Sequence, residues 1–163
     1  MNAFQQARTI EDIARAEILP WLHLKCESVE ECDSLWLQKI VGDFIVQVEG
    51  RKRGIELKAE AKFTSNLFLE VWSNLPELTP GWMVTSRAHW LFYFFLDTKT
   101  LYVIPMRELQ AWAFGIGQKE GRIYDFKEVA QTKYQQINMT KGRLVPLQAL
   151  RDARIPIKQY NFP

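Results

Sequence analysis

Two acidic residues and a lysine have the types and the spacing that suit chemistry on phosphate esters. Asp43 precedes Glu56 by thirteen residues, and Lys58 follows Glu56 after one residue. Carboxylates that converge without basic partners repel each other, and a hard divalent cation such as Mg²⁺ removes that conflict. Two carboxylates, the main-chain carbonyl of Leu57 and a substrate phosphate would suit Mg²⁺. The lysine could orient the water that the cation polarises, help to deprotonate it, or stabilise charge on the phosphate.

These residues lie in two stretches whose patterns predict one β-hairpin. Apolar side chains alternate with other residues over 44–48 and again over 55–59, and the glycine-bounded sequence GRKRG stands between the two runs. A hairpin that turns at residues 50–54 would bring Asp43 near Glu56, depending on its register.

The second strand of this hairpin would carry three charges on one face, because Glu56, Lys58 and Glu60 alternate with apolar residues. The alternative is an edge strand whose charged face is simply solvated, since Glu-x-Lys occurs by chance in many exposed strands. A third alternating run, residues 67–73, places Glu70 between two aromatic residues, which indicates a polar pocket beside a core.

The elements around this hairpin predict a single α/β or α+β domain built on one sheet. A first helix is expected at residues 9–22, because Thr9 and Asp12 resemble a capping box and Pro20 should bend or end the segment. Glu17 lies on the stripe that should face the core, or else at its rim. The other expected elements are a short helix within 27–42 capped by Ser28 and Glu31, strands at 90–96 and 101–104, a helix at 107–114, a strand at 134–139 and a helix at 145–152.

The composition is that of an ordinary globular protein. The chain has 163 residues, of which 47% are hydrophobic and 25% charged, and this excludes disorder, collagen and a disulfide scaffold. Its formal charge of +2 is too small for whole-molecule attraction to nucleic acid. Cys26 and Cys32 fit reduced thiols in a cytoplasmic protein. The longest apolar run, Trp90 to Leu96, is too short to cross a membrane. A secretory signal is not expected, because the first residues include Gln, Glu, Asp and Arg where such a signal would need an apolar run.

Asp43, followed at this spacing by Glu56-Leu57-Lys58 on the second strand of a hairpin, resembles the active-site signature of the PD-(D/E)xK nuclease superfamily, which includes restriction endonucleases and Holliday junction resolvases. TSNLFLEVWSN and GWMVTSRAHWLFYFFLDTKTLYVIP are similar to stretches of small phage and bacterial members. The resemblance covers residues 10–112 and implies a restriction-endonuclease-like α/β core with a central mixed β-sheet flanked by helices. It places this core in one domain, 1–163, with residues 113–163 as an extension.

The resemblance also implies Mg²⁺-dependent cleavage of phosphodiester bonds in DNA, with Mn²⁺ able to replace Mg²⁺, in a phage or bacterial cytoplasm. It leaves a homodimer open. The implied roles are metal ligands for Asp43, Glu56 and the Leu57 carbonyl, catalysis with water positioning for Lys58, a first-helix acid for Glu17, and a further ligand or water-positioning role for Glu70. Gly42 stands where the superfamily motif has proline.

Contacts to DNA phosphates are expected from residues near the hairpin turn and after its second strand, namely Arg51, Lys52, Arg53, Lys62, Thr64, Ser65 and Asn66. A turn that carries RKR only for solubility explains the first three equally well. His23 and His89 fit structural roles, because neither has a ligand partner at suitable spacing. The alternatives to an enzyme are a non-catalytic module of the same architecture that binds nucleic acid or protein, and a structural domain with a wet charged strand.

Overall fold

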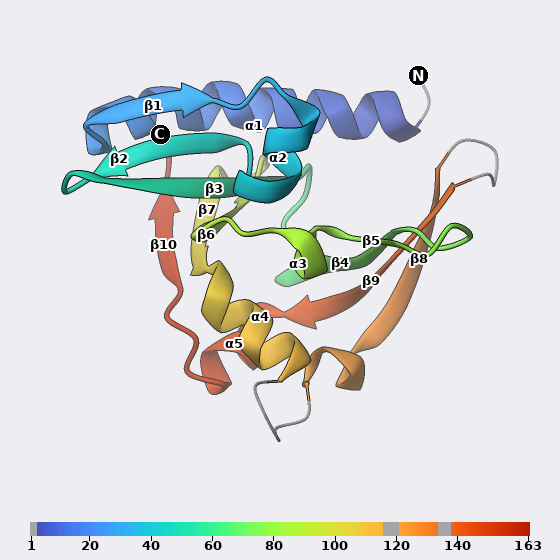
Figure 1. The fold of residues 1–163 in the computed structure, drawn as a ribbon. Helices are drawn as coiled ribbons and strands as arrows, with labels where there is room; N and C mark the ends of the chain where they lie inside the picture. The colour runs from blue at the N-terminus through green and yellow to red at the C-terminus, as the bar shows by residue number, and fades with distance from the viewer. Residues whose placement is uncertain (1–2, 116–120, 134–137) are drawn as a thin grey trace. The chain divides into compact units, whose positions relative to one another are not determined.

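The computed structural model describes residues 3–115, 121–133 and 138–163, and its contacts divide the chain into two compact units (Figure 1). The first unit comprises Met1–Phe63, Ser86–Met106 and Ile157–Pro163, and the second comprises Thr64–Thr85 and Arg107–Pro156. Each unit is therefore assembled from segments that are far apart in the sequence.

A mixed sheet of six strands forms the first unit. Its strands are β1 (Ser28–Glu31), β2 (Phe44–Val48), β3 (Arg51–Glu60), β6 (Trp90–Phe95), β7 (Thr100–Pro105) and β10 (Lys158–Asn161). They lie in the order β1-β2-β3-β6-β7-β10, with β3 and β6 parallel and every other neighbouring pair antiparallel. The expected mixed α/β class with a mixed central sheet is confirmed.

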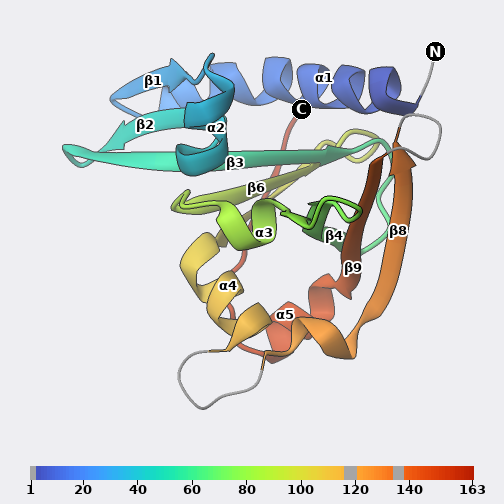
Figure 2. The ribbon, with the colours of Figure 1, turned by 45° about the vertical axis from the view of Figure 1, so that its right-hand side comes forward.

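Helix α1 (Ala3–Lys25) runs along this sheet beside β1, β2 and β3 (Figure 2). Ala14, Ile18 and Leu22 recur every fourth residue and are fully or almost fully buried against apolar side chains of the sheet, among them Phe44 and Phe94. This spacing places the three side chains on one stripe of the helix. Burial of that stripe holds α1 against the sheet.

The first helix is longer than the sequence predicted, because it starts at Ala3 and continues through Pro20 to Lys25. Proline removes one backbone donor but need not end a helix whose next turn is held by packing. Here Leu22, two residues beyond Pro20, is 1% exposed. The apolar stripe therefore prevails over the local helix breaker.

The prediction of a helix capped by Ser28 and Glu31 was wrong. Residues 28–31 form β1, which pairs antiparallel with β2, and the second helix α2 (Leu35–Val41) starts later. Its N-cap is Ser34, whose hydroxyl accepts a hydrogen bond from the Leu37 N–H at 3.5 Å. Strand pairing with a distant segment decided the structure of residues 28–31.

The hairpin of β2 and β3 is confirmed, but its turn is tighter than predicted. Val48 pairs with Arg51, so Glu49 and Gly50 alone form the turn, with φ values of 50° and 70°. Positive φ at both central residues is typical of a type I′ hairpin turn. The sequence RKR therefore begins β3 instead of forming the turn.

The second unit contains a separate antiparallel sheet, so the expectation of one sheet was wrong. Its strands lie in the order β5 (Thr79–Pro80), β4 (Asn66–Asn74), β9 (Asn138–Pro146) and β8 (Lys127–Lys133). The remaining elements are α3 (Trp82–Thr85), α4 (Met106–Phe114, whose first residue belongs to the first unit), the 3₁₀ helix η1 (Ile123–Asp125) and α5 (Leu147–Asp152). The third alternating run is indeed a strand, β4, but it pairs with β9.

Several predictions for the later part of the chain agree with the structure. Strands β6 and β7 and helix α4 lie where they were expected. The strand expected at 134–139 falls partly on residues 134–137, which lie outside the described part of the chain, and β9 extends on to Pro146. Residues beyond 112 supply β8 and β9 to the second sheet and β10 to the first.

The stripe on α1 gives a matched test of the fold. Ile18 is completely buried, whereas Ile13 on the same helix is 46% exposed. We expect Ile18→Ala to lower the free energy of unfolding by about 2–5 kcal/mol, because it leaves a cavity. Ile13→Ala should cost less than about 1 kcal/mol. Chemical denaturation measures both, and equal losses would contradict the packing of α1 described above.

Candidate functional site

Asp43 lies where β3 extends beyond its pairing with β2. The antiparallel pairing of β2 with β3 reaches its last pair at Phe44 and Ile55, but β3 continues to Glu60. The Asp43 N–H donates to the Ile55 carbonyl at 2.7 Å, and the carboxylate Oδ2 then accepts from the Leu57 N–H, also at 2.7 Å. The aspartate side chain thus supplies the hydrogen-bond acceptor that a neighbouring strand would supply elsewhere along β3.

Alternation along β3 also fixes the direction of the Leu57 carbonyl. Residues 55 and 57 turn their backbone groups to the same side of the strand, because successive residues of a strand point them to opposite sides. The Ile55 carbonyl and the Leu57 N–H both meet Asp43 on that side. The Leu57 carbonyl therefore faces the edge at which the Asp43 carboxylate lies.

The conformation of Gly42 excludes a proline at this position. Its φ is 105°, which proline cannot adopt, and its N–H donates to the Gln38 carbonyl at 3.0 Å. A Cβ at this position would lie 2.3 Å from the Ile55 carbonyl oxygen. Glycine is therefore required for α2 to end and for Asp43 to meet β3.

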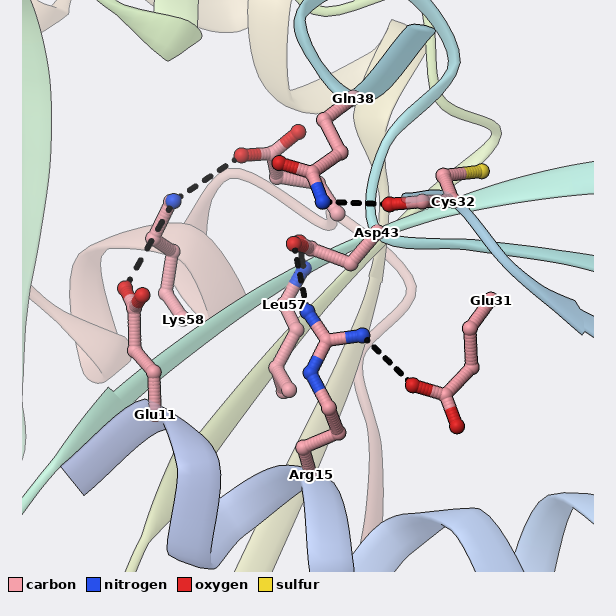
Figure 3. A network of polar contacts seen from close by, with 9 residues as sticks. Glu11, Arg15, Glu31, Cys32, Gln38, Asp43, Leu57 and Lys58 are labelled. Atoms are coloured by element: carbon pink, nitrogen blue, oxygen red, sulfur yellow. Dashed lines mark hydrogen bonds and ion pairs between the residues drawn. The ribbon is translucent and has the colours of Figure 1, made fainter. Parts of the chain in front are cut away.

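The buried Glu56 forms an ion pair with the half-buried Lys58 on β3. Glu56 is 6% exposed, its Oε1 lies 3.0 Å from Lys58 Nζ, and its Oε2 accepts from the Ser86 hydroxyl at 3.3 Å. Lys58 Nζ also lies 3.9 Å from Glu11 Oε1 of α1 (Figure 3). For Glu56, the alternative of a solvated strand face is wrong.

The surroundings raise the pKa values of both Glu56 and Lys58. Burial raises the pKa of Glu56, the positive charge of Lys58 opposes that shift, and the negative charge of Asp43 adds to it. For Lys58, burial would lower the pKa, but the carboxylates of Glu56, Glu11 and Asp43 together outweigh burial and raise it. Lys58 is therefore an ammonium ion in this arrangement, suited to stabilising charge and orienting water.

Arg15 of α1 is a further residue of this network, and no motif in the sequence indicates it. One guanidinium nitrogen lies 3.2 Å from Asp43 Oδ1 and the other lies 3.3 Å from Glu31 Oε2 at the end of β1 (Figure 3). Glu11 and Arg15 are one helical turn apart, so the sequence shows that they share a face of α1. It does not show that this face meets the edge of β3.

The structure brings Glu11, instead of Glu17, to Lys58. Glu17 lies on another side of α1, and its carboxylate is 3.5 Å from Lys99 Nζ. Glu70 lies in β4, in the second unit, where half-buried positions alternate with buried ones. Its role as a further ligand or water-positioning residue stays a prediction.

Within the first unit, the expected DNA-contacting residues do not form one cluster. Arg51, Lys52 and Arg53 begin β3, five residues or fewer before Glu56, and a strand rises about 3.3 Å per residue, so Arg51 starts about 16 Å away along the strand. Lys62 is exposed in the first unit, while Thr64, Ser65 and Asn66 belong to the second. The Thr64 hydroxyl and the Asn66 backbone hydrogen-bond each other locally.

The network around Asp43 carries an excess of negative charge. Its ionisable members carry a formal charge of −2, because four carboxylates face two cations: Glu11, Glu31, Asp43 and Glu56 against Arg15 and Lys58. Within the described residues, no three His, Cys, Asp or Glu side chains form a group that could hold a metal. Mg²⁺, however, commonly uses one or two carboxylates and completes its shell with water and phosphate oxygens. Asp43, Glu56 and the Leu57 carbonyl fit that donor set.

Comparisons with known proteins find no match: no family model, no curated protein and no solved structure matches this chain. Within the ranges that the structure describes, every helix is too short or too polar to cross a membrane. The resemblance to the PD-(D/E)xK superfamily therefore stays an expectation, and the geometry above is what supports a function.

The role of Gly42 can be tested against Gly50, which also has a positive φ but no atom near the position of a Cβ. We expect Gly42→Ala to lower the free energy of unfolding by about 3 kcal/mol or more, because it combines backbone strain with a clash against β3. Gly50→Ala should cost about 1 kcal/mol. Denaturant titrations measure the difference, and similar losses would show that β3 does not approach Gly42 so closely.

His89 connects the start of β6 to β3, because its side-chain Nδ1 accepts from the Gly54 N–H at 2.9 Å and its backbone N–H donates to the Gly54 carbonyl at 2.8 Å. Burial and the charge of Arg53 lower the pKa of His89. Its contribution to stability is therefore complete above the unfolded-state pKa of about 6.5 and decreases as the pH falls toward the folded-state pKa. His89→Gln keeps an acceptor without titrating, so the stability difference between wild type and variant should change between about pH 7.5 and 5.5. A pH-independent difference would contradict this assignment.

Proposed function

We propose that this protein is a Mg²⁺-dependent endonuclease that hydrolyses phosphodiester bonds in DNA, with Asp43, Glu56 and Lys58 as its active-site residues. One observation carries the proposal. The Asp43 carboxylate pairs with the backbone of β3 at Leu57, between Glu56 and Lys58. Asp43 therefore lies beside β3 between the other two motif residues, in a network whose net charge of −2 a divalent cation would neutralise.

Each residue has a role in this proposal that follows from its contacts. Asp43, Glu56 and the Leu57 carbonyl would hold the cation, which would supply Lewis acidity and an activated water when bound. Lys58, held by the Glu56 carboxylate, would orient that water and stabilise negative charge on the phosphate. Glu11 would keep the Lys58 ammonium near the edge of β3.

DNA is proposed as the substrate because the motif resembles that of restriction endonucleases and resolvases. The exposed Arg51 and Lys52 at the start of β3 and the exposed Lys62 after its end would contact backbone phosphates on either side of the site. Mn²⁺ would replace Mg²⁺, since both prefer oxygen ligands. A phage or bacterial cytoplasm is the compartment that the same resemblance suggests.

A second candidate is a non-catalytic module of the same architecture that binds nucleic acid or protein. The observation in its favour is that both motif carboxylates already have cations of the protein as partners, Lys58 for Glu56 and Arg15 for Asp43. Such pairing is also what a stable site needs before a metal enters, because a buried carboxylate is costly without a partner.

Cleavage of supercoiled and branched DNA with Mg²⁺, Mn²⁺ or EDTA tests the proposal. Lys58→Met keeps the aliphatic length of the side chain but removes its charge, so we expect cleavage to fall by at least about 100-fold. Lys25→Met removes an exposed lysine at the end of α1 and should leave cleavage unchanged. Asp43→Asn should weaken Mg²⁺ binding in calorimetric titrations.

Thermal unfolding of each variant separates loss of activity from loss of fold. DNA binding without cleavage by the folded wild type, under all three conditions, would favour the binding module. Equal activity of Lys58→Met and wild type would refute the active site proposed here, whatever the substrate.

A further inference from the structure

Arg15 connects two carboxylates, and only one of them belongs to the motif. Its guanidinium lies 3.2 Å from Asp43 Oδ1 and 3.3 Å from Glu31 Oε2, and its central carbon lies 4.9 Å from the centre of the Phe44 ring. All three partners come from the first unit, at the ends of β1 and β2 nearest the site. The side chain is about three-quarters shielded from solvent, with 26% exposed.

The Asp43 carboxylate that would bind a metal is also held by Arg15. Its Oδ2 is committed to the Leu57 N–H at 2.7 Å, which fixes the carboxylate on β3. Its Oδ1 accepts from Arg15. A divalent cation on this carboxylate and the guanidinium would lie close together, and their like charges oppose simultaneous binding.

Glu31 and Phe44 would keep the Arg15 side chain at the site after it releases Asp43. When Oδ1 is taken, the nitrogen on Glu31 keeps its partner, and the Phe44 ring continues to support the guanidinium. The nitrogen that is released then points at the edge of β3 and has no anion to meet. A phosphate oxygen is the acceptor that arginine recognises best there.

We propose that Arg15 is an exchangeable counter-ion, which holds Asp43 in the metal-free protein and passes to a phosphate oxygen of the bound nucleic acid when a divalent cation takes Asp43. This inference rests on the proposed function and adds to it a positioning residue outside the motif, together with an order of binding in which the cation precedes the substrate. Glu31 is the fixed partner in both states.

The experiment is a calorimetric titration of the DNA-free protein with Mn²⁺ and with Mg²⁺. Arg15→Met removes the competing charge, and we expect it to bind Mn²⁺ about tenfold more tightly than wild type, a typical size for coupling between sites. The same variant should bind a short DNA duplex more weakly in saturating Ca²⁺, because the phosphate contact is lost. Arg122→Met, which breaks an exposed ion pair of the second unit, is the matched control and should change neither constant.

Glu31→Gln provides a second variant whose effect depends on Arg15. Without Glu31, Arg15 should hold Asp43 more strongly and so weaken Mn²⁺ binding. The loss of Mn²⁺ affinity from wild type to Glu31→Gln should therefore be larger than the loss from Arg15→Met to the double variant. Equal effects of Glu31→Gln in both backgrounds would mean that Glu31 acts only through its charge and would overturn the exchange.

The outcomes distinguish this inference from the proposed function. Unchanged or weaker Mn²⁺ binding by folded Arg15→Met, with wild-type DNA cleavage intact, overturns the exchange and leaves the nuclease assignment standing. No Mn²⁺ binding by either protein overturns both. If Arg15→Met proves unstable, Arg15→Lys answers the same question. A lysine cannot bridge both carboxylates, so Arg15→Lys should bind Mn²⁺ more tightly than wild type.

Discussion

The hydrogen bond from the Leu57 N–H to the Asp43 carboxylate is the interaction on which the candidate site depends. β3 extends beyond its pairing with β2, and the backbone groups on that side would lack partners from a strand. A carboxylate there satisfies the Leu57 donor and is itself held on the strand edge. The spacing of the motif follows from this bond, because Glu56 and Lys58 flank the residue whose N–H Asp43 accepts.

The electrostatics of the site follow from packing two acids close to each other in a shielded place. Glu56 is buried, and its pKa is raised both by that burial and by the charge of Asp43. Lys58 and Arg15 reduce this cost from different elements, the first from β3 and the second from α1. They do not remove it, because four carboxylates remain against two cations, and this deficit is what a divalent ion would fill.

The local patterns of the sequence predicted the strands and the hairpin, because these depend on residues close together in the chain. Alternation located β2 and β3, and apolar runs separated by a turn sequence located β6 and β7. In the hairpin of β2 and β3, Asp43 lies beside Leu57, the residue between Glu56 and Lys58. Patterns of this kind could not predict pairings between distant segments: Ser28–Glu31 joins β2, and β4 joins β9 in a second sheet. They also could not assign Glu11 and Arg15 to the site, because helical periodicity gives the face of a helix but not the strand that it meets.

Helix α1 packs against the core with one stripe of its surface and contacts the candidate site with the adjacent stripe. Ala14 and Ile18 are buried against the sheet, while Arg15 follows Ala14 by a rotation of about 100° and so faces the edge at Asp43. Glu11 lies one turn before Arg15 and reaches Lys58. Because the rotation of α1 is set by its buried stripe, the apolar packing also sets the positions of two charges in the site. A change in that packing would therefore move the Arg15 guanidinium and the Glu11 carboxylate together, without touching any residue of the motif.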